Sequence, residues 1–461
     1  MKETDIIATK DRAGTETELF GWVANRRDHG KLVFVDLRDR TGIIQVVFSP
    51  KTAGYDDAQK LRNEWVIRIK GLVKERPEKM RNPDIPTGAV EFEPHELEIL
   101  AEATTPPLPL DTDGYEVGED TRQEWRYLDL RRPRLARNLM ARHRAALHVR
   151  TVLSEHGFME VETPILTKST PEGARDYVVP SRLYAGSFFA LPQSPQQYKQ
   201  LLMIAGAEKY FQLARCFRDE DTRGDRQPEF TQLDMEMSFV EREDVMAINE
   251  AVLIDLVKKQ FPHKRIQETP FPRMSYAEAL EKYQTDRPDL RKDKDDKDLL
   301  AFCWVIDFPF FEKTEEGWTF THNPFSAPKP EHAAWHLTGE HTGEILTTQY
   351  DIVLNGWEIG GGSIRAHTPA ALRATFRTMG FADDRIDANF GHMLAALAAG
   401  APPHGGIAWG WDRLMALLLD EPNIREVIAF PKTGDARDLM MHAPSELSAA
   451  QLRELHLKVE R

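Results

Sequence analysis

Arginines and carboxylates are concentrated in segment 216–239, which reads CFRDEDTRGDRQPEFTQLDMEMSF. Both ends of the segment alternate with a period of two, which is typical of two strands joined by a loop. The alternation places Arg218 and Glu220 on the polar face of the first strand, and Phe230 and Asp234 on that of the second. A solvated outer face would explain this pattern. A ligand-binding face would as well, because arginine can hold a phosphate or a carboxylate with two parallel hydrogen bonds.

A second group of acids lies in segment 350–367, YDIVLNGWEIGGGSIRAH. The dipeptide Asn355-Gly356 predicts a two-residue hairpin turn of type I′. Such a turn makes Asp351 and Glu358 diagonal neighbours on one face, roughly 7–8 Å apart at the backbone. Two carboxylates in this arrangement can share a Mg²⁺ ion together with phosphate oxygens.

Three successive glycines, 360–362, follow in the second strand of this hairpin and precede Arg365. Because they lack side chains, a ligand can approach the backbone closely, although a surface hairpin with a glycine bulge is the alternative. Segment 405–420, GGIAWGWDRLMALLLD, has apolar residues at helical spacing and predicts a buried helix in which Arg413 is the only cation. A buried arginine must be paired or face a ligand.

The elements that must position these residues fall into two regions. Five short strands are expected over 19–100, which predicts a small β-barrel, and the Pro- and Thr-rich stretch 102–114 interrupts them. Beyond it, helices are expected over 138–157 and 242–261, with mostly strand between 187 and 239. This mixture predicts an α+β fold class. We therefore expect a barrel domain over 1–102, a linker or hinge over 103–137, and a larger domain over 138–461.

The charge of the chain is unevenly distributed. Its 461 residues, of which 41% are hydrophobic and 29% charged, suit a globular protein of two or three domains, and the net charge of −14 does not by itself favour a nucleic-acid partner. Residues 130–150, however, contain seven arginines and no acid. This stretch is either a functional basic surface or a solvated helix face.

The cysteine content and the hydropathy pattern limit the setting. Cys216 and Cys303 are the only cysteines and lie far apart, which argues against a disulfide framework and a thiolate zinc site. No apolar run approaches the roughly 20 residues needed to cross a bilayer, and no apolar signal segment is seen at the start. We expect a cytoplasmic protein with no membrane association.

The segments described above resemble motifs 2 and 3 of class II aminoacyl-tRNA synthetases, and HGFMEVETPILT (156–167) resembles motif 1, in which Pro164 would lie at a dimer interface. Nearly the whole chain is similar to the bacterial-type aspartyl-tRNA synthetases, through RYLDLRRP, TPEGARDYVVPSR, LPQSPQQYKQLLM, FRDEDTRGDRQPEFTQLD, WVIDFPFFE, GGGSIR and IAFPKT. The resemblance implies a homodimer in which an antiparallel catalytic sheet flanked by helices is fused to an N-terminal oligonucleotide-binding (OB-fold) barrel.

The family joins an amino-acid carboxylate to the α-phosphate of ATP and then passes the acyl group to the 3′ end of a tRNA. Such chemistry depends on positioning and charge neutralisation. The resemblance implies that Asp351 and Glu358 hold Mg²⁺ and, with Arg218 and Arg413, are the catalytic residues. The implied ATP-binding residues are Arg218, Glu220, Arg226, Gln227, Phe230, Glu358 and Arg413.

The amino-acid substrate implied by the resemblance is L-aspartate. Cations would bind its side-chain carboxylate and would exclude asparagine, whose amide would leave them unpaired. The implied aspartate-binding residues are Glu172, Ser194, Gln196, Lys199, Arg218, Asp234, His322 and Arg365. Asn323 stands where many relatives have a second histidine.

The resemblance also implies that the barrel binds the tRNA anticodon. The implied contacts are Arg27, His29, Phe34, Gln45 and Glu91, with Phe34 stacking on a base; a core position for Phe34 is the alternative. His29 replaces the leucine of relatives restricted to tRNA-Asp, which implies that tRNA-Asn is charged as well and that a tRNA-dependent amidotransferase is a partner.

One departure from the family and two alternative functions follow from the sequence. Bacterial-type relatives carry a domain-sized insertion, which is absent here between about 291 and 304, where only a loop-sized connection remains. A synthetase for asparagine or lysine is disfavoured by the paired cations Lys199 and Arg365. A catalytically inactive, tRNA-binding or regulatory paralogue would have lost phosphate-binding residues such as Arg218 and Arg413, and both are present.

Overall fold

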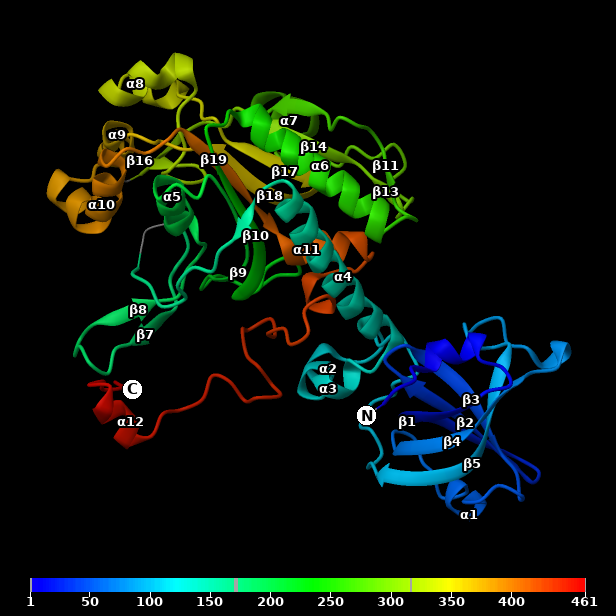
Figure 1. Ribbon diagram of the computed structural model, residues 1–461. Coiled ribbons are helices and arrows are strands. Elements are labelled where there is room, and N and C mark those ends of the chain that lie inside the picture. The colour runs from blue at the N-terminus through cyan, green and yellow to red at the C-terminus, as the bar shows by residue number, and fades with distance from the viewer. Residues whose placement is uncertain (1, 170–172, 316, 461) are drawn as a thin grey trace. The chain divides into compact units, whose positions relative to one another are not determined.

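The structure is a computed structural model that describes residues 2–169, 173–315 and 317–460 (Figure 1). The chain divides into two compact units, Met1–Arg137 and Asn138–Arg461. Each unit has a hydrophobic core of its own. Among the described residues, no helix is long and apolar enough to cross a membrane.

The first unit contains the predicted barrel of five strands. The strands close in the order β1 (Glu16–His29), β2 (Leu32–Asp39), β3 (Gly42–Phe48), β5 (Val90–Ala101) and β4 (Val66–Glu75). Buried and partly exposed residues alternate along β2 and β3, so that one side of each strand fills the barrel and the other faces outward. The unit also contains α1 (Tyr55–Ala58) and, within the stretch expected to be a linker, α2 (Glu119–Glu124) and α3 (Arg126–Asp129).

The second unit is built on an eight-stranded sheet. Its order is β12 (Arg273–Ser275), β14 (Phe302–Ile306), β17 (Tyr350–Leu354), β18 (Trp357–Ile364), β19 (His404–Gly410), β10 (Glu229–Ser238), β9 (Lys209–Phe217) and β6 (Met159–Glu160). The central strands from β14 to β9 pair antiparallel, as expected. The two edge pairs, β12 with β14 and β6 with β9, are parallel.

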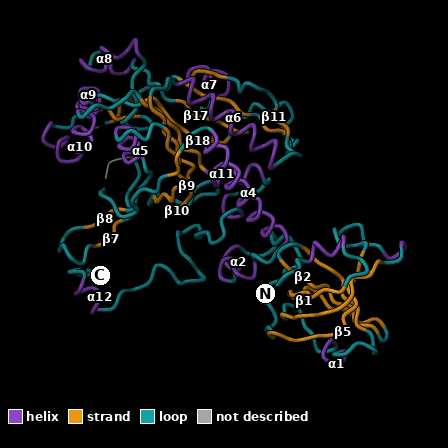
Figure 2. Tube along the Cα trace, viewed as in Figure 1, coloured by secondary structure: helices purple, strands orange, loops and turns teal. Residues whose placement is uncertain are grey.

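Helices cover both faces of this sheet (Figures 1 and 2). On one face, α4 (Pro133–Glu155), α6 (Arg242–Gln260) and α11 (Trp411–Leu418) bury apolar side chains against Leu233, Met235 and Trp409. On the other face, α5 (Gln196–Ile204) packs on β9 and β10. The remaining elements are β7 (Val178–Pro180), β8 (Phe188–Ala190), β11 (Arg265–Ile266), α7 (Tyr276–Tyr283), β13 (Leu299–Leu300), β15 (Phe311–Thr314), β16 (Gly317–Phe320), α8 (Ala333–Thr338), α9 (Pro369–Thr378), α10 (Asp383–Ala398) and α12 (Ala449–Glu454).

Two local predictions were wrong. Segment 405–420 is not one helix, because its first part forms β19, a central strand between β18 and β10. The glycines there serve close strand packing: a Cβ on Gly406 would lie only 2.0 Å from Met235 O. Segment 187–239 was expected to be mostly strand, but it also contains α5, which carries Lys199.

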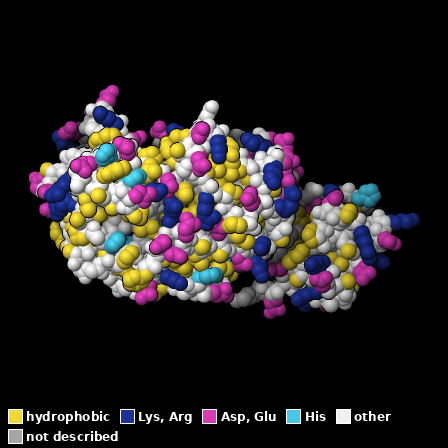
Figure 3. All heavy atoms as spheres, turned by 90° about the horizontal axis from the view of Figure 1, so that it is seen from above, with side chains coloured by type: hydrophobic (Ala, Val, Ile, Leu, Met, Phe, Trp, Pro, Cys, Tyr) yellow, Lys and Arg dark blue, Asp and Glu magenta, His cyan; other side chains and the backbone are white. Residues whose placement is uncertain are grey.

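Several arginines of the stretch 130–150, most of which is helix α4, pair with acids. Arg132 pairs with Asp129, Arg142 with Asp412 and Arg150 with Glu160, at 2.6, 2.6 and 3.0 Å, whereas Arg137 and Arg144 are exposed. Over the face of the molecule that Figure 3 shows, positive and negative side chains are interspersed. The structure therefore favours structural ion pairs in this stretch over a functional basic surface.

The loop-sized connection between about residues 291 and 304 is held to its surroundings by hydrogen bonds of two side-chain amides. Gln267 donates from Nε2 to Leu290 O and accepts from Lys292 N, at 3.0 and 2.8 Å. Asn355, in the turn between β17 and β18, accepts from Ala301 N at 2.8 Å and donates to Leu299 O at 3.0 Å. The end of the connection is thus attached directly to the hairpin that carries Asp351 and Glu358.

Asn355 also has a left-handed backbone (φ 50°), which asparagine tolerates better than alanine does. We expect Asn355→Ala to lower the free energy of unfolding by about 2–3 kcal/mol, because it adds backbone strain to the loss of two hydrogen bonds. Asn355→Gly, which removes the hydrogen bonds without strain, should lose less. Urea unfolding followed by tryptophan fluorescence measures both variants, and an unchanged midpoint for Asn355→Ala would contradict the expectation.

Candidate active site

A cavity of about 500 Å³ opens on the polar face of the sheet in the second unit. Its lining brings together residues that are up to 251 positions apart in the chain, from Gly173 to Ile424. The predicted residues that line it are Ser194, Gln196, Lys199, Arg218, Glu220, Arg226, Gln227, Phe230, Asp234, His322, Asp351, Glu358, Arg365 and Arg413. Glu172, which was also predicted, lies outside the described residues.

The predicted strand pair β9–β10 supplies one wall. Arg218 follows the end of β9, and its guanidinium carbon lies 5.1 Å from the centre of the Phe230 ring, while its Nε donates to Gln193 O at 3.4 Å. Arg226 and Glu220 form an ion pair at 3.3 Å across the loop. This wall therefore offers an arginine beside an aromatic face, an arrangement that can hold a phosphate next to a stacked ring.

Gln227, at the end of the loop, is buried and has a structural partner. Its side-chain amide accepts from Lys432 N at 2.7 Å and donates to Lys432 O at 3.1 Å. These bonds fix the end of the loop against the segment that follows α11.

Arg413 lies in the first turn of α11 and joins the loop to the hairpin. It donates from Nε to Asp225 O and from Nη1 to Glu358 O, both at 3.1 Å, and its Nη2 is 3.1 Å from the Asp225 carboxylate. The sequence predicted that this arginine is paired or faces a ligand. It is paired and also lines the cavity.

The acid pair of the β17–β18 hairpin lies in the register predicted for its turn. Leu354 pairs with Trp357 and Val353 with Glu358, and a bulge then interrupts the ladder between Ile352 and Val353. Asp351 is buried and accepts from Gln349 Nε2 at 2.7 Å. Burial and the negative charge of Glu358 together raise the pKa of Asp351 well above its ordinary value.

This pair of carboxylates fits a divalent cation. A cation would relieve the repulsion between the two acids, and the space beside them depends on a glycine, because a Cβ on Gly361 would lie 2.7 Å from Asp351 Oδ1. Within the described chain, no three His, Cys, Asp or Glu side chains form a metal cluster. The remaining ligands of a cation here would have to come from backbone, water or a bound substrate.

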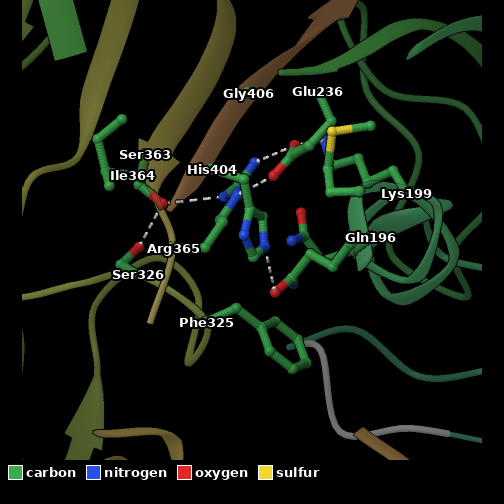
Figure 4. A network of polar contacts seen from close by, with 12 residues as sticks. Gln196, Lys199, Glu236, Phe325, Ser326, Ser363, Ile364, Arg365, His404 and Gly406 are labelled. Carbon is green, nitrogen blue, oxygen red and sulfur yellow. Dashed lines mark hydrogen bonds and ion pairs between the residues drawn. The ribbon is translucent and has the colours of Figure 1, made fainter. Parts of the chain in front are cut away.

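Four charged side chains form a buried quartet: Lys199, Asp234, Glu236 and Arg365. Lys199, Asp234 and Arg365 line the cavity, and Figure 4 shows Glu236 between Lys199 and Arg365. Lys199 Nζ is 2.7 Å from Asp234 and 3.2 Å from Glu236. Arg365 bonds to both oxygens of Glu236, at 2.8 and 3.1 Å. The two cations and two acids neutralise one another, as burial requires.

The two acids of the quartet titrate differently. Burial raises the pKa of Asp234 to about 6, although Lys199 opposes this effect. Burial would also raise the pKa of Glu236, but the charges of Arg365 and Lys199 outweigh it and hold that pKa at about 2. Sequence reasoning missed Glu236 as a site residue. Its signal was its position two residues after Asp234 on the same polar strand face.

Two residues singled out in the sequence, His322 and Asn323, lie near Asp351. His322 Nδ1 is 4.0 Å from Asp351 Oδ2, and its ring packs edge-on against Phe308. Asn323 donates to Gln349 Oε1 at 3.4 Å and accepts from Phe325 N, so that both ends of its side-chain amide are hydrogen-bonded. Gln349, which bridges Asn323 and Asp351, was not predicted.

In the first unit, the predicted nucleic-acid contacts lie on the outward side of the barrel or at its rim. Phe34 is half-buried, pairs in register with Arg27 and Val47, and is not part of the barrel core, so the core alternative is wrong. Gln45 donates to Glu91 at 3.4 Å, and Arg27 pairs with Asp36 at 2.9 Å. His29 is exposed at the end of β1.

Comparisons with known proteins agree with this architecture. Residues 118–434 match the family model described as class II tRNA synthetases (D, K and N), and residues 18–106 match the OB-fold nucleic acid binding domain. Similar curated proteins include the aspartate–tRNA(Asp/Asn) ligase of Dehalococcoides mccartyi, 39% identical over 597 alignment positions that cover 100% of this chain and 99% of the relative. That of Rubrobacter xylanophilus is 41% identical over 572 positions, covering 97% and 95%.

Since the alignment with the first relative is longer than the 461 residues of this chain, the relative contains residues without a counterpart here, in agreement with the missing insertion. Among solved structures, asparaginyl-tRNA synthetase from Pyrococcus horikoshii with asparaginyl-adenylate has the same fold, with a TM-score of 0.74 at 24% identity over 92% of this chain and 96% of that one. The chain therefore belongs to the class II tRNA synthetases, among the aspartate–tRNA ligases.

Proposed function

We propose that this protein activates L-aspartate with ATP to aspartyl-adenylate and transfers the aspartyl group to the 3′ end of tRNA-Asp and of tRNA-Asn. The observation that carries the proposal is a single cavity whose lining combines two groups of charged residues. Lys199, Asp234 and Arg365 belong to the buried quartet, and the other group consists of Arg218, Arg413, Asp351 and Glu358. The quartet suits a small zwitterion that carries a second carboxylate. The other group suits a triphosphate.

At the ATP end, the adenine stacks on Phe230 with Glu220 beside it, and Arg218 binds the α-phosphate and the reacting carboxylate. Arg413 and Arg226 neutralise the outer phosphates. Asp351 and Glu358 would hold Mg²⁺, which when bound would add positive charge beside the phosphates. In this proposal the protein orients two anions for in-line attack and stabilises the charge that develops, without a protein nucleophile.

At the amino-acid end, Arg365 and Lys199 receive the side-chain carboxylate of aspartate, and Asp234 receives its ammonium group. The aspartate-binding set is completed by Ser194, Gln196, His322 and Glu172, of which Glu172 lies outside the described residues. Asparagine is rejected because its neutral amide cannot compensate these cations.

The barrel binds the anticodon through Arg27, His29, Phe34, Gln45 and Glu91. The polar pairs on its outward side support this assignment, as does the name of the similar proteins, aspartate–tRNA(Asp/Asn) ligase. Aspartyl-tRNA-Asn is a mischarged product, and a tRNA-dependent amidotransferase that converts it to asparaginyl-tRNA is the partner that we infer. In this proposal residues 1–102 form the anticodon-binding domain, 103–137 a hinge and 138–461 the catalytic domain.

We further propose that the protein is a cytoplasmic homodimer. Large apolar side chains between α4 and β8 are exposed, among them Met159 (50%), Leu166 (52%), Val178 (56%) and Phe188 (48%). A second copy of the chain would cover this surface. Cys216 and Cys303 are buried and form no disulfide, which suits a reducing compartment.

The experiment that tests the function is aminoacylation of purified tRNA-Asp and tRNA-Asn, side by side, with aspartate, asparagine and lysine. We expect aspartate to be attached to both tRNAs and the other amino acids to neither. Charging of tRNA-Asp alone would remove the second tRNA from the proposal. Binding of tRNA without any charging would favour the inactive paralogue.

Arg218→Ala should lower the rate of aspartate-dependent pyrophosphate exchange into ATP by about 100-fold or more, because the α-phosphate loses its counter-charge. Binding of tRNA through the barrel should remain. The matched control is Arg215→Ala, three residues earlier in β9, because Arg215 pairs with Glu229 and does not line the cavity. Unchanged exchange in Arg218→Ala would refute the role given to this arginine.

The raised pKa of Asp234, about 6, predicts a pH dependence of aspartate binding. Asp234 is ionised above this pKa and protonated below it, and only the ionised form attracts the ammonium group. The KM for aspartate should therefore rise about tenfold between pH 7 and pH 5, whereas the KM for ATP changes little. Asp234→Asn should show a high KM without this pH dependence, and a flat wild-type profile would contradict the prediction.

A further inference from the structure

We propose that Glu236 is a positioning residue for Arg365. By binding one side of the guanidinium, it orients Arg365 so that one N–H of Nη1 and one N–H of Nη2 face the substrate carboxylate. This inference rests on the proposed function, because it concerns how the aspartate pocket recognises its ligand. Glu236 is not among the residues expected to touch aspartate. It acts through Arg365 and, on its other side, through Lys199.

The hydrogen bonds of Arg365 account for three of its five N–H groups (Figure 4). Nε donates to Glu236 Oε1 at 2.8 Å, Nη2 donates to Glu236 Oε2 at 3.1 Å, and Nη1 donates to Ser363 Oγ at 2.9 Å. Glu236 thus occupies the side of the guanidinium that includes Nε. One N–H on each of Nη1 and Nη2 has no partner among the residues that the structure describes, and such a pair can bind a carboxylate end-on.

Neighbouring groups hold Arg365 in this orientation. Ser363, which accepts from Nη1, is hydrogen-bonded through its own Oγ to Ser326 Oγ at 2.9 Å, and both serines are buried. The backbone N–H of Arg365 donates to His404 O at 2.9 Å. With 2% of its surface exposed, Arg365 cannot turn without breaking several of these bonds at once.

The space for the Glu236 carboxylate depends on the neighbouring strand. A Cβ on Gly406 would lie 2.1 Å from Glu236 Oε2. The glycine of β19 therefore leaves the room that the carboxylate needs beside Arg365.

Lys199 has no comparable pair of N–H groups to offer. Its Nζ donates to Asp234 Oδ1 at 2.7 Å and to Met235 O at 3.4 Å, and it lies 3.2 Å from Glu236 Oε2 in an ion pair. At least two of its three N–H groups are therefore already bonded to the protein. Lys199 supplies positive charge to the pocket, whereas Arg365 supplies the directed hydrogen bonds to the substrate. Glu236 binds both cations and thereby keeps each of them in its own role.

Two substitutions test this role. Glu236→Gln keeps the shape of the side chain but removes its charge, and Glu236→Asp keeps the charge but withdraws the carboxylate by one methylene. Glu250→Gln is the matched control: Glu250 is also buried, accepts from Phe271 N and Trp304 Nε1, and pairs with Arg273 at 3.1 Å away from the cavity lining. The Glu250→Gln variant reports how the loss of a buried carboxylate affects stability alone.

The measurement is aspartate-dependent pyrophosphate exchange, with KM for aspartate, KM for ATP and kcat determined separately for each variant. Both Glu236 variants should raise the KM for aspartate by about 10- to 100-fold, as expected when charge-assisted bonds to the substrate are misdirected, with the KM for ATP unchanged. Glu250→Gln should leave both KM values at wild-type levels. Glu236→Asp keeps the test decisive if Glu236→Gln does not fold.

An unchanged KM for aspartate in Glu236→Asp, or an equal rise in both KM values, would overturn the positioning role while leaving the proposed function intact. If the wild-type protein itself shows no exchange with aspartate, the proposed function fails instead. The two failures are therefore distinguished by the wild-type reaction alone.

Discussion

Burial of charge is the constraint on which the rest of this site depends. Lys199, Asp234, Glu236 and Arg365 are almost completely withdrawn from water. An unpaired charge in such a place costs several kcal/mol, and removing one partner of a buried pair typically costs about 3–5 kcal/mol. The four groups must therefore stay paired, and pairing fixes their directions. The four side chains must neutralise one another when no substrate is bound. The same arrangement of positive and negative groups suits an amino acid, which carries both charges.

The fold provides this arrangement by separating the two faces of one sheet. Along β10 the alternation sends Leu233, Met235 and Met237 into the core beneath α6 and α11, and sends Asp234 and Glu236 to the opposite face, beneath α5. Glycines on β18 and β19 remove the side chains that would otherwise collide with Asp351 and Glu236. The same strands thus stabilise the domain on one side and bind charge on the other.

Much of this could be predicted because the relevant signals are local. The Asn355-Gly356 turn determined the register that brings Asp351 and Glu358 together, and period-two alternation assigned Arg218 and Asp234 to the polar face. The helix predicted over 405–420 was right only for its second half, α11, because in the first half packing between two central strands outweighed the helical spacing of apolar residues. The pairing of Glu236 with Arg365 could not be read from the sequence, since it joins residues 129 positions apart through a sheet whose strand order was unknown.

The central claim is that Arg365 is held in a fixed direction before the substrate arrives. A crystal structure of the protein with bound aspartate tests it most directly. The account predicts that the side-chain carboxylate binds end-on to Nη1 and Nη2 while Nε and Nη2 keep their bonds to Glu236. A carboxylate bound by Lys199 alone, or an Arg365 that has left Glu236 to reach it, would contradict the account.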